Sequence, residues 1–419
     1  MTLAIQTDRT RIRAAASSTR YVLARITAPP APERETRLPV NVAIVLDRSG
    51  SMADERKFEL AREAVEQSLR LLRSDDRFAL VVYDSVIDVL MQSTRATPEM
   101  KRRALDALRE ISPRGSTDLG GGWLSGCEQI AEFLDDDRVS RCLLLTDGLA
   151  NHGITDRDEL ARHAGELRQR GVSTSTFGVG VQFDERLLRD MAHEGGGNFY
   201  FIEGASEIPA LITSELGEAL EVTLRNASLI VTLPPGATGE TLNRFRQTPT
   251  AEPNELRVDV GDLVSGQELE VVVKVAFPSG DVGQLISADF ELASVGNVIP
   301  GTECRQAWTY ATHHDNDVQP RNGEVDRAVA ELYAARARAE ATEANRDGRY
   351  DHARQVLEAT ARRIREYAGD DPKLRHLAEK LVSEEYVFGM PMALMARKAS
   401  YYAAETALKG RDPSGRARR

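Results

Sequence analysis

Between residue 40 and about residue 218, short apolar runs alternate with amphipathic stretches. The runs include NVAIVLD, RFALVVYD, RCLLLTD and VSTSTFGVG, each of which has the length of one buried strand. Between the first two runs, apolar residues recur three or four positions apart, as on one face of a helix: Phe58, Ala61, Val65, Leu69 and Leu72. This alternation predicts a doubly wound, mostly parallel, Rossmann-like α/β sheet over residues 39–220. The run VIDVLMQS follows its neighbour after a tight turn, which predicts an antiparallel edge strand.

From residue 221 the pattern changes to short segments in which apolar and polar residues alternate. LEVVVKVAF and ISADFELAS are typical of an antiparallel sandwich with one buried face, and we assign residues 221–315 to it. The N-terminal residues 1–38 also have the pattern of strands, and we expect them to join this sandwich. The α/β domain would then be inserted between strands of the sandwich. A separate edge strand or a loose arm is the alternative for the N-terminal residues.

Residues 316–410 have the period of helices and predict a small helical bundle. One stretch, NRDGRYDHA, resembles a single tetratricopeptide-like helix–turn–helix unit. There is no second copy, so the sequence does not predict a solenoid. We expect the Gly- and Arg-containing end, residues 411–419, to be a disordered tail.

Composition and charge narrow the class of protein. The chain has 419 residues, enough for two or three domains, and its formal net charge of -11 disfavours nucleic acid as the main partner. Its three cysteines, Cys127, Cys142 and Cys304, fit no zinc spacing and no disulfide framework, which favours a reducing compartment. No apolar run is long enough to span a membrane and the first residues lack a signal core, so we expect a cytoplasmic protein. A signal peptide already removed, or a non-classical export route, stays open.

Five oxygen-bearing side chains stand in three turns: Asp47, Ser49, Ser51, Thr117 and Asp147. The first and third turns directly follow apolar runs, and the second precedes a helical stretch. Ligands of doubly wound sheets bind at the carboxyl ends of the strands, so these turns fall at the expected edge. Carboxylates and hydroxyls are hard donors that suit Mg²⁺ or Mn²⁺, with Ca²⁺ less favoured, although ligand type alone does not decide the metal. The alternative is that they are ordinary turn residues.

The set D-x-S-x-S, then a threonine, then T-D-G resembles the metal-ion-dependent adhesion site of von Willebrand factor A (VWA) domains, here of the intracellular prokaryotic type. The resemblance implies that Ser49, Ser51 and Thr117 bind a metal directly. It implies that Asp47 and Asp147 act directly or through water. A partner protein's Asp or Glu carboxylate would then complete the coordination. Residues near the site would shape the partner-binding rim: Arg48, Asp118, Leu149 and His152.

Two other functions were weighed against metal-dependent protein binding. A metal-dependent hydrolase could use His152 or His193 as a base, and the HHD at 313–315 could hold a transition metal. The chain has no Ser-His-Asp arrangement, phosphate loop or zinc motif, so we expect no enzyme. The other alternative is an adaptor or co-chaperone for an AAA+ ATPase. The flanking regions loosely resemble inter-alpha-trypsin-inhibitor heavy chains and plant RING-type VWA proteins, but this chain has no RING cysteines.

Overall fold

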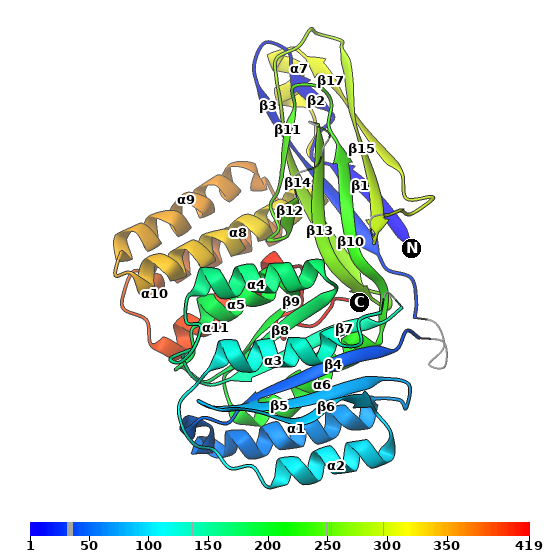
Figure 1. Cartoon of the computed structure of the whole chain (residues 1–419). Coiled ribbons are helices and arrows are strands. Elements are labelled where there is room, and N and C mark those ends of the chain that lie inside the picture. Colours follow the sequence, from blue (N-terminus) through cyan, green and yellow to red (C-terminus); the bar gives the residue numbers. More distant parts are fainter. Residues whose placement is uncertain (32–36, 136, 249, 251, 253, 296) are drawn as a thin grey trace. The chain divides into compact units, whose positions relative to one another are not determined.

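The computed structural model describes residues 1–31, 37–135, 137–248, 250, 252, 254–295 and 297–419 (Figure 1). The chain forms two compact units, and each is described by itself. Ala31–Val222 make up the second unit, whereas Met1–Pro30 and Thr223–Arg419 together make up the first. The chain therefore leaves the first unit, builds the second and returns, which confirms the predicted insertion.

The second unit contains one six-stranded sheet. Its order is β6-β5-β4-β7-β8-β9, and all neighbours are parallel except β5 and β6. The strands are β4 Val40–Asp47, β5 Arg77–Tyr83, β6 Ile87–Arg95, β7 Val139–Thr146, β8 Val172–Val179 and β9 Gly196–Ile202. Every residue of β4 and β7 is buried, as expected for central parallel strands that helices cover on both faces. The predicted sheet and its antiparallel edge strand are confirmed.

Helices flank this sheet, and glycines bring one of them unusually close. The helices are α1 Lys57–Leu71, α2 Pro98–Arg109, α3 Leu119–Ala131, α4 Arg157–Gln169, α5 Glu185–Glu194 and α6 Ile208–Leu220. Helix α3 packs on the central strands β4, β5 and β7. A Cβ at Gly126 would lie 2.3 Å from Val45 Cγ2, and one at Gly122 would lie 2.4 Å from the Tyr83 ring. The GGGWLSG pattern therefore lets α3 approach the strand ends that carry the candidate site.

The first unit contains two β-sheets packed as a sandwich. One sheet has the order β1-β3-β14-β11, and the other has the order β12-β13-β10-β15-β17-β2 with β16 paired to β15. The pairs β1–β3, β3–β14, β14–β11, β12–β13, β10–β15, β15–β16 and β15–β17 are antiparallel, whereas β17 and β2 are parallel. The strands are β1 Thr2–Thr7, β2 Arg11–Arg13, β3 Ser18–Thr27, β10 Val222–Thr232, β11 Thr238–Thr241, β12 Arg246–Thr248, β13 Glu255–Val264, β14 Glu268–Phe277, β15 Leu285–Ser294, β16 Asn297–Val298 and β17 Cys304–Ala311. Because β3 pairs with β14 along its whole length, the N-terminal strands join the sandwich as predicted.

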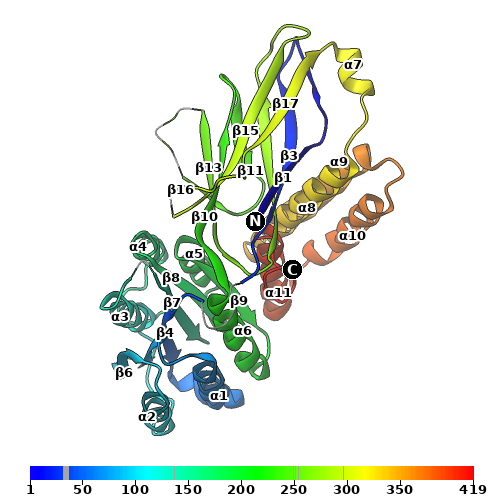
Figure 2. The ribbon, with the colours of Figure 1, turned by 90° about the vertical axis from the view of Figure 1, so that its right-hand side faces the viewer.

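The C-terminal helices form a bundle, and two of them, at Gly323–Arg346 and Leu394–Leu408, pack on the first sheet of the sandwich (Figures 1 and 2). The C-terminal helices are α7 His313–Val318, α8 Gly323–Arg346, α9 Tyr350–Ala368, α10 Pro372–Phe388 and α11 Leu394–Leu408. Along β14, Val271 and Val273 enter the sandwich core, whereas Val272 packs against α8 and α11 together with Leu23. Alternating side chains of one strand thus serve two cores, because successive side chains point to opposite faces of a sheet. The predicted helical bundle is confirmed, and it shares a core with the sandwich.

The C-terminal residues differ from our expectation of a disordered tail over residues 411–419. Arg411 and Ala417 form a β-bridge, and the side chain of Asp412 accepts hydrogen bonds from Ser414 and Arg416. The backbone N–H of Glu268 donates to the carbonyl of Arg418 at 2.9 Å. These contacts give the segment a defined turn against the start of β14.

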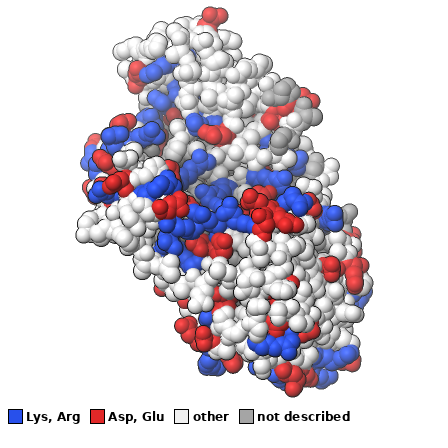
Figure 3. All heavy atoms as spheres, turned by 60° about the vertical axis from the view of Figure 1, so that its left-hand side comes forward, with Lys and Arg blue, Asp and Glu red and all other residues white. Residues whose placement is uncertain are grey.

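Charges of both signs are mixed on one face of the molecule, and the described helices do not suit a membrane span. Asp and Glu side chains lie beside Lys and Arg side chains across the face shown in Figure 3, so the net charge of -11 is not concentrated there in one acidic field. Within the described residues, every helix is too short or too polar to cross a membrane.

Candidate metal centre

The candidate centre lies where two neighbouring parallel strands end. Asp47 is the last residue of β4, and Asp147 directly follows β7. The register pairs Leu46 with Leu145, so the carboxyl ends of both strands meet at the same edge of the sheet. The tertiary structure therefore brings together two motifs that lie about one hundred residues apart in the sequence.

Asp47 is fully buried and is held by two hydrogen bonds. Its Oδ1 accepts the backbone N–H of Ser49 at 2.7 Å, and its Oδ2 accepts the Thr146 hydroxyl at 2.6 Å. Burial raises the pKa of this carboxyl to about 6, although the hydrogen bonds from Thr146 and Ser49 oppose that rise. A buried carboxylate with a raised pKa is one that a bound cation would stabilise.

Asp147 is the second buried carboxylate, and it is linked to both serines. The Ser51 hydroxyl donates to Asp147 Oδ1 at 2.6 Å, and the Ser51 and Ser49 hydroxyls are 3.2 Å apart. The first and third turns of the motif are thus joined side chain to side chain. The hydroxyls of Ser49 and Ser51 and both carboxylates form one connected group of hard oxygen donors.

Thr117 lies in the loop before α3, and backbone contacts fix that loop against the other two. Its N–H donates to Asn151 Oδ1 at 2.9 Å, and its carbonyl accepts the N–H groups of Asn151 and His152, each at 3.2 Å. A Cβ at Gly148 would lie 3.5 Å from Thr117 Oγ1, so this hydroxyl lies close to the T-D-G turn. The Gly50 N–H donates to the Gly115 carbonyl at 3.3 Å, which links the first turn to the same loop.

Lys57 is a member of this centre that sequence reasoning missed. Its ammonium lies 2.7 Å from Asp147 Oδ2, and the lysine side chain is only 14 % exposed. Glu55 and Arg56, directly before it, both have a positive φ, which is strained for residues other than glycine. The only sequence signal was a lysine at the start of a helix five residues after Met52, which is also an ordinary surface pattern.

The donor set suits a divalent cation of the magnesium type. It offers serine and threonine hydroxyls with two carboxylates, and oxygen donors of this kind are preferred by Mg²⁺ and Mn²⁺. Within the described residues, no group of three or more His, Cys, Asp or Glu side chains could hold a metal. That an ammonium lies on Asp147 shows that the field at this position attracts a cation.

The four residues predicted to form the partner-binding rim differ in their exposure to solvent. Leu149 is 54 % exposed and the His152 side chain is 57 % exposed, so both can meet a partner. Asp118 caps α3 by accepting the N–H of Gly121, and His152 Nδ1 lies 3.4 Å from its Oδ2. Arg48 differs from our expectation. It is only 3 % exposed, and its guanidinium forms ion pairs with Asp84 and Asp88. Arg48 therefore stabilises the turn and is not available to contact a partner.

The histidines weighed for catalysis or for a transition metal lie on different elements. His193 lies in the last turn of α5, and His313 and His314 begin α7 in the other compact unit. His152 contacts Asp118 and no other described carboxylate. The absence of an enzymatic activity stays a prediction.

Comparison with known proteins agrees with this geometry. Residues 41–214 match the family model of the von Willebrand factor type A domain. The chain is 26% identical over 239 residues to the uncharacterized protein YfbK of Escherichia coli, covering 56% of this chain and 41% of that protein. It is 30% identical over 178 residues to inter-alpha-trypsin inhibitor heavy chain H1 of Sus scrofa, covering 40% of this chain and 19% of that protein. The chain thus spans less than half the length of these curated relatives.

Two solved structures resemble nearly the whole chain in fold. A von Willebrand factor type A protein from Catenulispora acidiphila superposes with a TM-score of 0.71 at 19% identity, covering 96% of this chain and 89% of that one. The ArnB paralog VWA2 from Sulfolobus acidocaldarius superposes with a TM-score of 0.58 at 16% identity, covering 93% and 99%. These two matches show a shared fold, and the family model that matches residues 41–214 assigns the inserted α/β unit to the von Willebrand factor type A domain family.

Proposed function

We propose that this chain is a protein-binding module whose VWA domain takes Mg²⁺ or Mn²⁺ and captures an acidic side chain of a partner. The observation that carries this proposal is the connected oxygen set at the sheet edge, in which Ser51 and a cationic group share the buried carboxylate of Asp147. The bound metal would supply a Lewis-acidic position that accepts a carboxylate oxygen. Ser49, Ser51 and Thr117 would hold the metal, with Asp47 and Asp147 balancing its charge.

The burial of the two carboxylates explains why this site would favour a bound cation. Asp47 and Asp147 are both fully buried, so their unneutralised charge would be costly. Two carboxylates and a divalent cation leave the centre close to neutral. An incoming carboxylate would then occupy the open coordination position, and it would bring only a single negative charge to the centre. The exposed Leu149 and His152 lie next to the motif and would supply contact area around it.

In the metal-free state, we propose that Lys57 neutralises Asp147. The strained Glu55–Arg56 backbone leads directly into this lysine, so its position depends on the turn that also carries Ser51. Metal binding would compete with the ammonium for the same carboxylate. Displacement of Lys57 would free the start of α1, which offers a route from metal occupancy to a local conformational change.

The test is a capture experiment from extract of the source cells, with the whole chain as bait. We expect the bait to retain a partner protein in Mg²⁺ and to release it in EDTA. We expect the Ser51→Ala bait to retain none of that protein. The matched control is Ser206→Ala, an exposed serine of the same domain outside the motif. If the same proteins are retained regardless of EDTA and of Ser51→Ala, the metal site does not mediate binding.

A direct measurement of Mg²⁺ affinity distinguishes a chain that binds no metal from one that binds metal but no partner. Calorimetric titration of the whole chain with MgCl₂ should show one site that Ser51→Ala weakens and Ser206→Ala leaves unchanged. If the chain binds Mg²⁺ but captures no protein, the proposed metal site is supported. The proposal that it binds a carboxylate-bearing partner from that extract is then rejected. An AAA+ ATPase as partner stays a prediction from sequence, and the capture experiment would identify it.

A further inference from the structure

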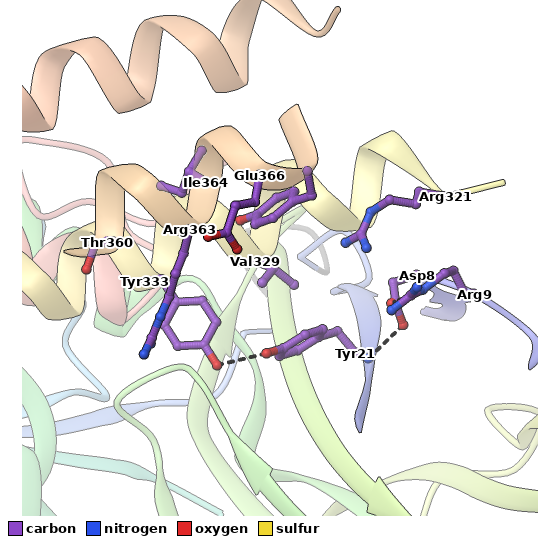
Figure 4. A pocket seen from close by; sticks show the side chains of 11 residues that line it. Asp8, Arg9, Tyr21, Arg321, Val329, Tyr333, Thr360, Arg363, Ile364 and Glu366 are labelled. Carbon is purple, nitrogen blue, oxygen red and sulfur yellow. Dashed lines mark hydrogen bonds and ion pairs between the residues drawn. The ribbon is translucent and has the colours of Figure 1, made fainter. Parts of the chain in front are cut away.

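A cavity of about 350 Å³ lies in the sandwich-and-helix unit, whereas the metal motifs belong to the other unit (Figure 4). Tyr21 of β3 forms one side and Tyr333 of α8 another, and Thr360 and Glu366 of α9 lie above them. Tyr367 of α9 also lines the cavity. The volume is within the range of small-molecule sites. The cavity therefore has the size and the enclosing elements of a ligand site, and its chemistry depends on which lining groups are already engaged.

Several charged groups at one end of the cavity are used for structure. Arg9 lies 3.3 Å from Asp8, and Arg321 makes ion pairs of 2.7 and 2.5 Å with Asp326. The Arg321 guanidinium also lies over the Tyr367 ring, 4.9 Å from its centroid. These contacts fix the loops before α8 and after β1, so this end of the cavity is preformed and close to neutral.

The other end carries polar hydrogens that have no acceptor among the described residues, and its arginine is exposed. Arg363 extends from α9 beside Tyr333, and no described residue forms a hydrogen bond or an ion pair with it. The hydroxyls of Tyr21 and Tyr333 are 3.0 Å apart. One hydroxyl donates to the other, which leaves one O–H of the pair free to donate. Burial raises the pKa of Tyr21, so this phenol keeps its proton near neutral pH.

Apolar groups lie between these polar ends. Val329 of α8 and the buried Ile364 of α9 line the cavity together with the tyrosine rings. Glu366 also lines it and is exposed, so a ligand with several negative charges would meet repulsion. The combination is one free guanidinium, one free hydroxyl hydrogen and an apolar wall.

We propose that this cavity, the carboxylate cavity, binds a small organic monocarboxylate. The carboxylate would lie between Arg363 and the Tyr21–Tyr333 hydroxyl pair. The hydrocarbon or aromatic body would pack on Val329 and Ile364. A charge-assisted hydrogen bond gives this end its preference for an anion, and the apolar wall gives the preference for an organic body over an inorganic ion.

The test uses 3-phenylpropionate as the probe and the whole chain as the receptor, with binding followed by saturation-transfer NMR. The neutral analogue 3-phenylpropan-1-ol has the same body without the charge, and inorganic phosphate has charge without the body. We expect 3-phenylpropionate to bind at least about tenfold more tightly than either, because a charge-assisted hydrogen bond contributes that much in a partly enclosed site. Equal binding of the acid and the alcohol, or no binding of the acid, would overturn the proposal.

Arg363→Met provides the decisive variant, and Arg362→Met is its matched control. Arg362 is its neighbour on the same helix and is exposed as Arg363 is, but it does not line the cavity. Both variants remove the same charge, so a non-specific electrostatic effect would weaken the probe equally in both. We expect about a tenfold loss for Arg363→Met and an unchanged affinity for Arg362→Met. The titration is run in EDTA, so that its outcome is independent of the metal centre.

Discussion

The candidate metal centre and the proposed carboxylate cavity are assembled in opposite ways. The metal centre uses loops at the ends of neighbouring strands of one sheet, and its carboxylates are fully buried and already hydrogen-bonded. The carboxylate cavity uses the first strands and the C-terminal helices, from Asp8 to Tyr367, and its key cation is exposed. The two carboxylates at the strand edge are positioned by sheet topology, since they lie at the ends of neighbouring parallel strands. A site between a sheet and helices depends on how the two layers pack.

The largest effect is expected at the metal centre. Asp147→Asn keeps the shape of the side chain and removes the charge that Lys57 and Ser51 now contact. We expect Mg²⁺ affinity to fall at least about a hundredfold, because a buried charge that faces a cation contributes several kcal/mol. Calorimetric titration measures it, and Asp158→Asn, whose side chain is 90% exposed, is the control. An Asp147→Asn chain that binds Mg²⁺ as before would show that the predicted ligand set is wrong.

The packing between sheet and helices is tested by Leu23→Ala. Leu23 is fully buried between β3 and the helices, in the same cluster as Val272 and Leu332. We expect the free energy of unfolding of this unit to fall by about 3 kcal/mol, from lost burial and the cavity left behind. Urea unfolding followed by fluorescence measures it.

The same variant sharpens the comparison between the two sites. We expect Leu23→Ala to weaken 3-phenylpropionate binding, since Tyr21 lies two residues away on the same strand. Mg²⁺ affinity should stay unchanged, because the metal centre lies in the other compact unit. A loss of Mg²⁺ affinity in this variant would contradict the independence of the two sites.

The close approach of α3 to the sheet is tested by Gly126→Ala. The added methyl would lie 2.3 Å from Val45 Cγ2, so α3 must shift away from β4. We expect a loss of about 2 kcal/mol in the free energy of unfolding, within the usual cost of overpacking. Gly217→Ala is the matched control on α6, where a Cβ meets nothing within 4 Å. It should stabilise the protein by about 0.5 kcal/mol, because alanine favours the helix.

A smaller effect of opposite sign is expected for Lys57→Met. Removing the ammonium leaves Asp147 without its neutralising partner, so a divalent cation no longer has to displace it. We expect Mg²⁺ affinity to rise about tenfold and the metal-free protein to melt at a lower temperature. Arg70→Met, on an exposed face of the same helix, is the control. Unchanged Mg²⁺ affinity would show that Lys57 does not compete for the site.

The smallest effect is expected for Tyr333→Phe in the carboxylate cavity. This change removes one hydroxyl of the Tyr21–Tyr333 pair and leaves the aromatic ring in place. The Tyr21 O–H can then donate to the ligand instead, so we expect only about a threefold loss of 3-phenylpropionate affinity. A loss as large as that of Arg363→Met would move the main recognition from the guanidinium to the hydroxyls.

Most of the fold could be predicted because its elements have clear periods. The fully apolar runs of β4 and β7 predicted central parallel strands, and the alternation in β14 predicted a sandwich strand. The alternation did not show that β14 would be buried on both faces. That burial arises because α8 and α11 cover the outer face of the sheet, a contact between segments far apart in the sequence. The turn formed by residues 411–419 was missed for the same reason, since its partner is the start of β14.

The candidate metal centre was predicted in part. Asp47, Ser49 and Ser51 lie within five residues, so their proximity follows from the local chain. That Asp147 joins them follows from the adjacency of β4 and β7. Arg48 was expected on the rim, yet its ion pairs with Asp84 and Asp88 turn it inward. Lys57 was missed because the strained backbone at Glu55 and Arg56, which presents it to Asp147, leaves no signal in residue type.

The sequence by itself determined the order of the layers and the chemistry of the strand-end donors, because hydrophobic period and turn chemistry are local properties of the chain. Only the tertiary structure decided which charges are satisfied. It placed Lys57 on Asp147, turned Arg48 inward, and left Arg363 without an acceptor among the described residues. The physical reason is that burial and pairing of a charge depend on groups that the fold brings from elsewhere in the chain.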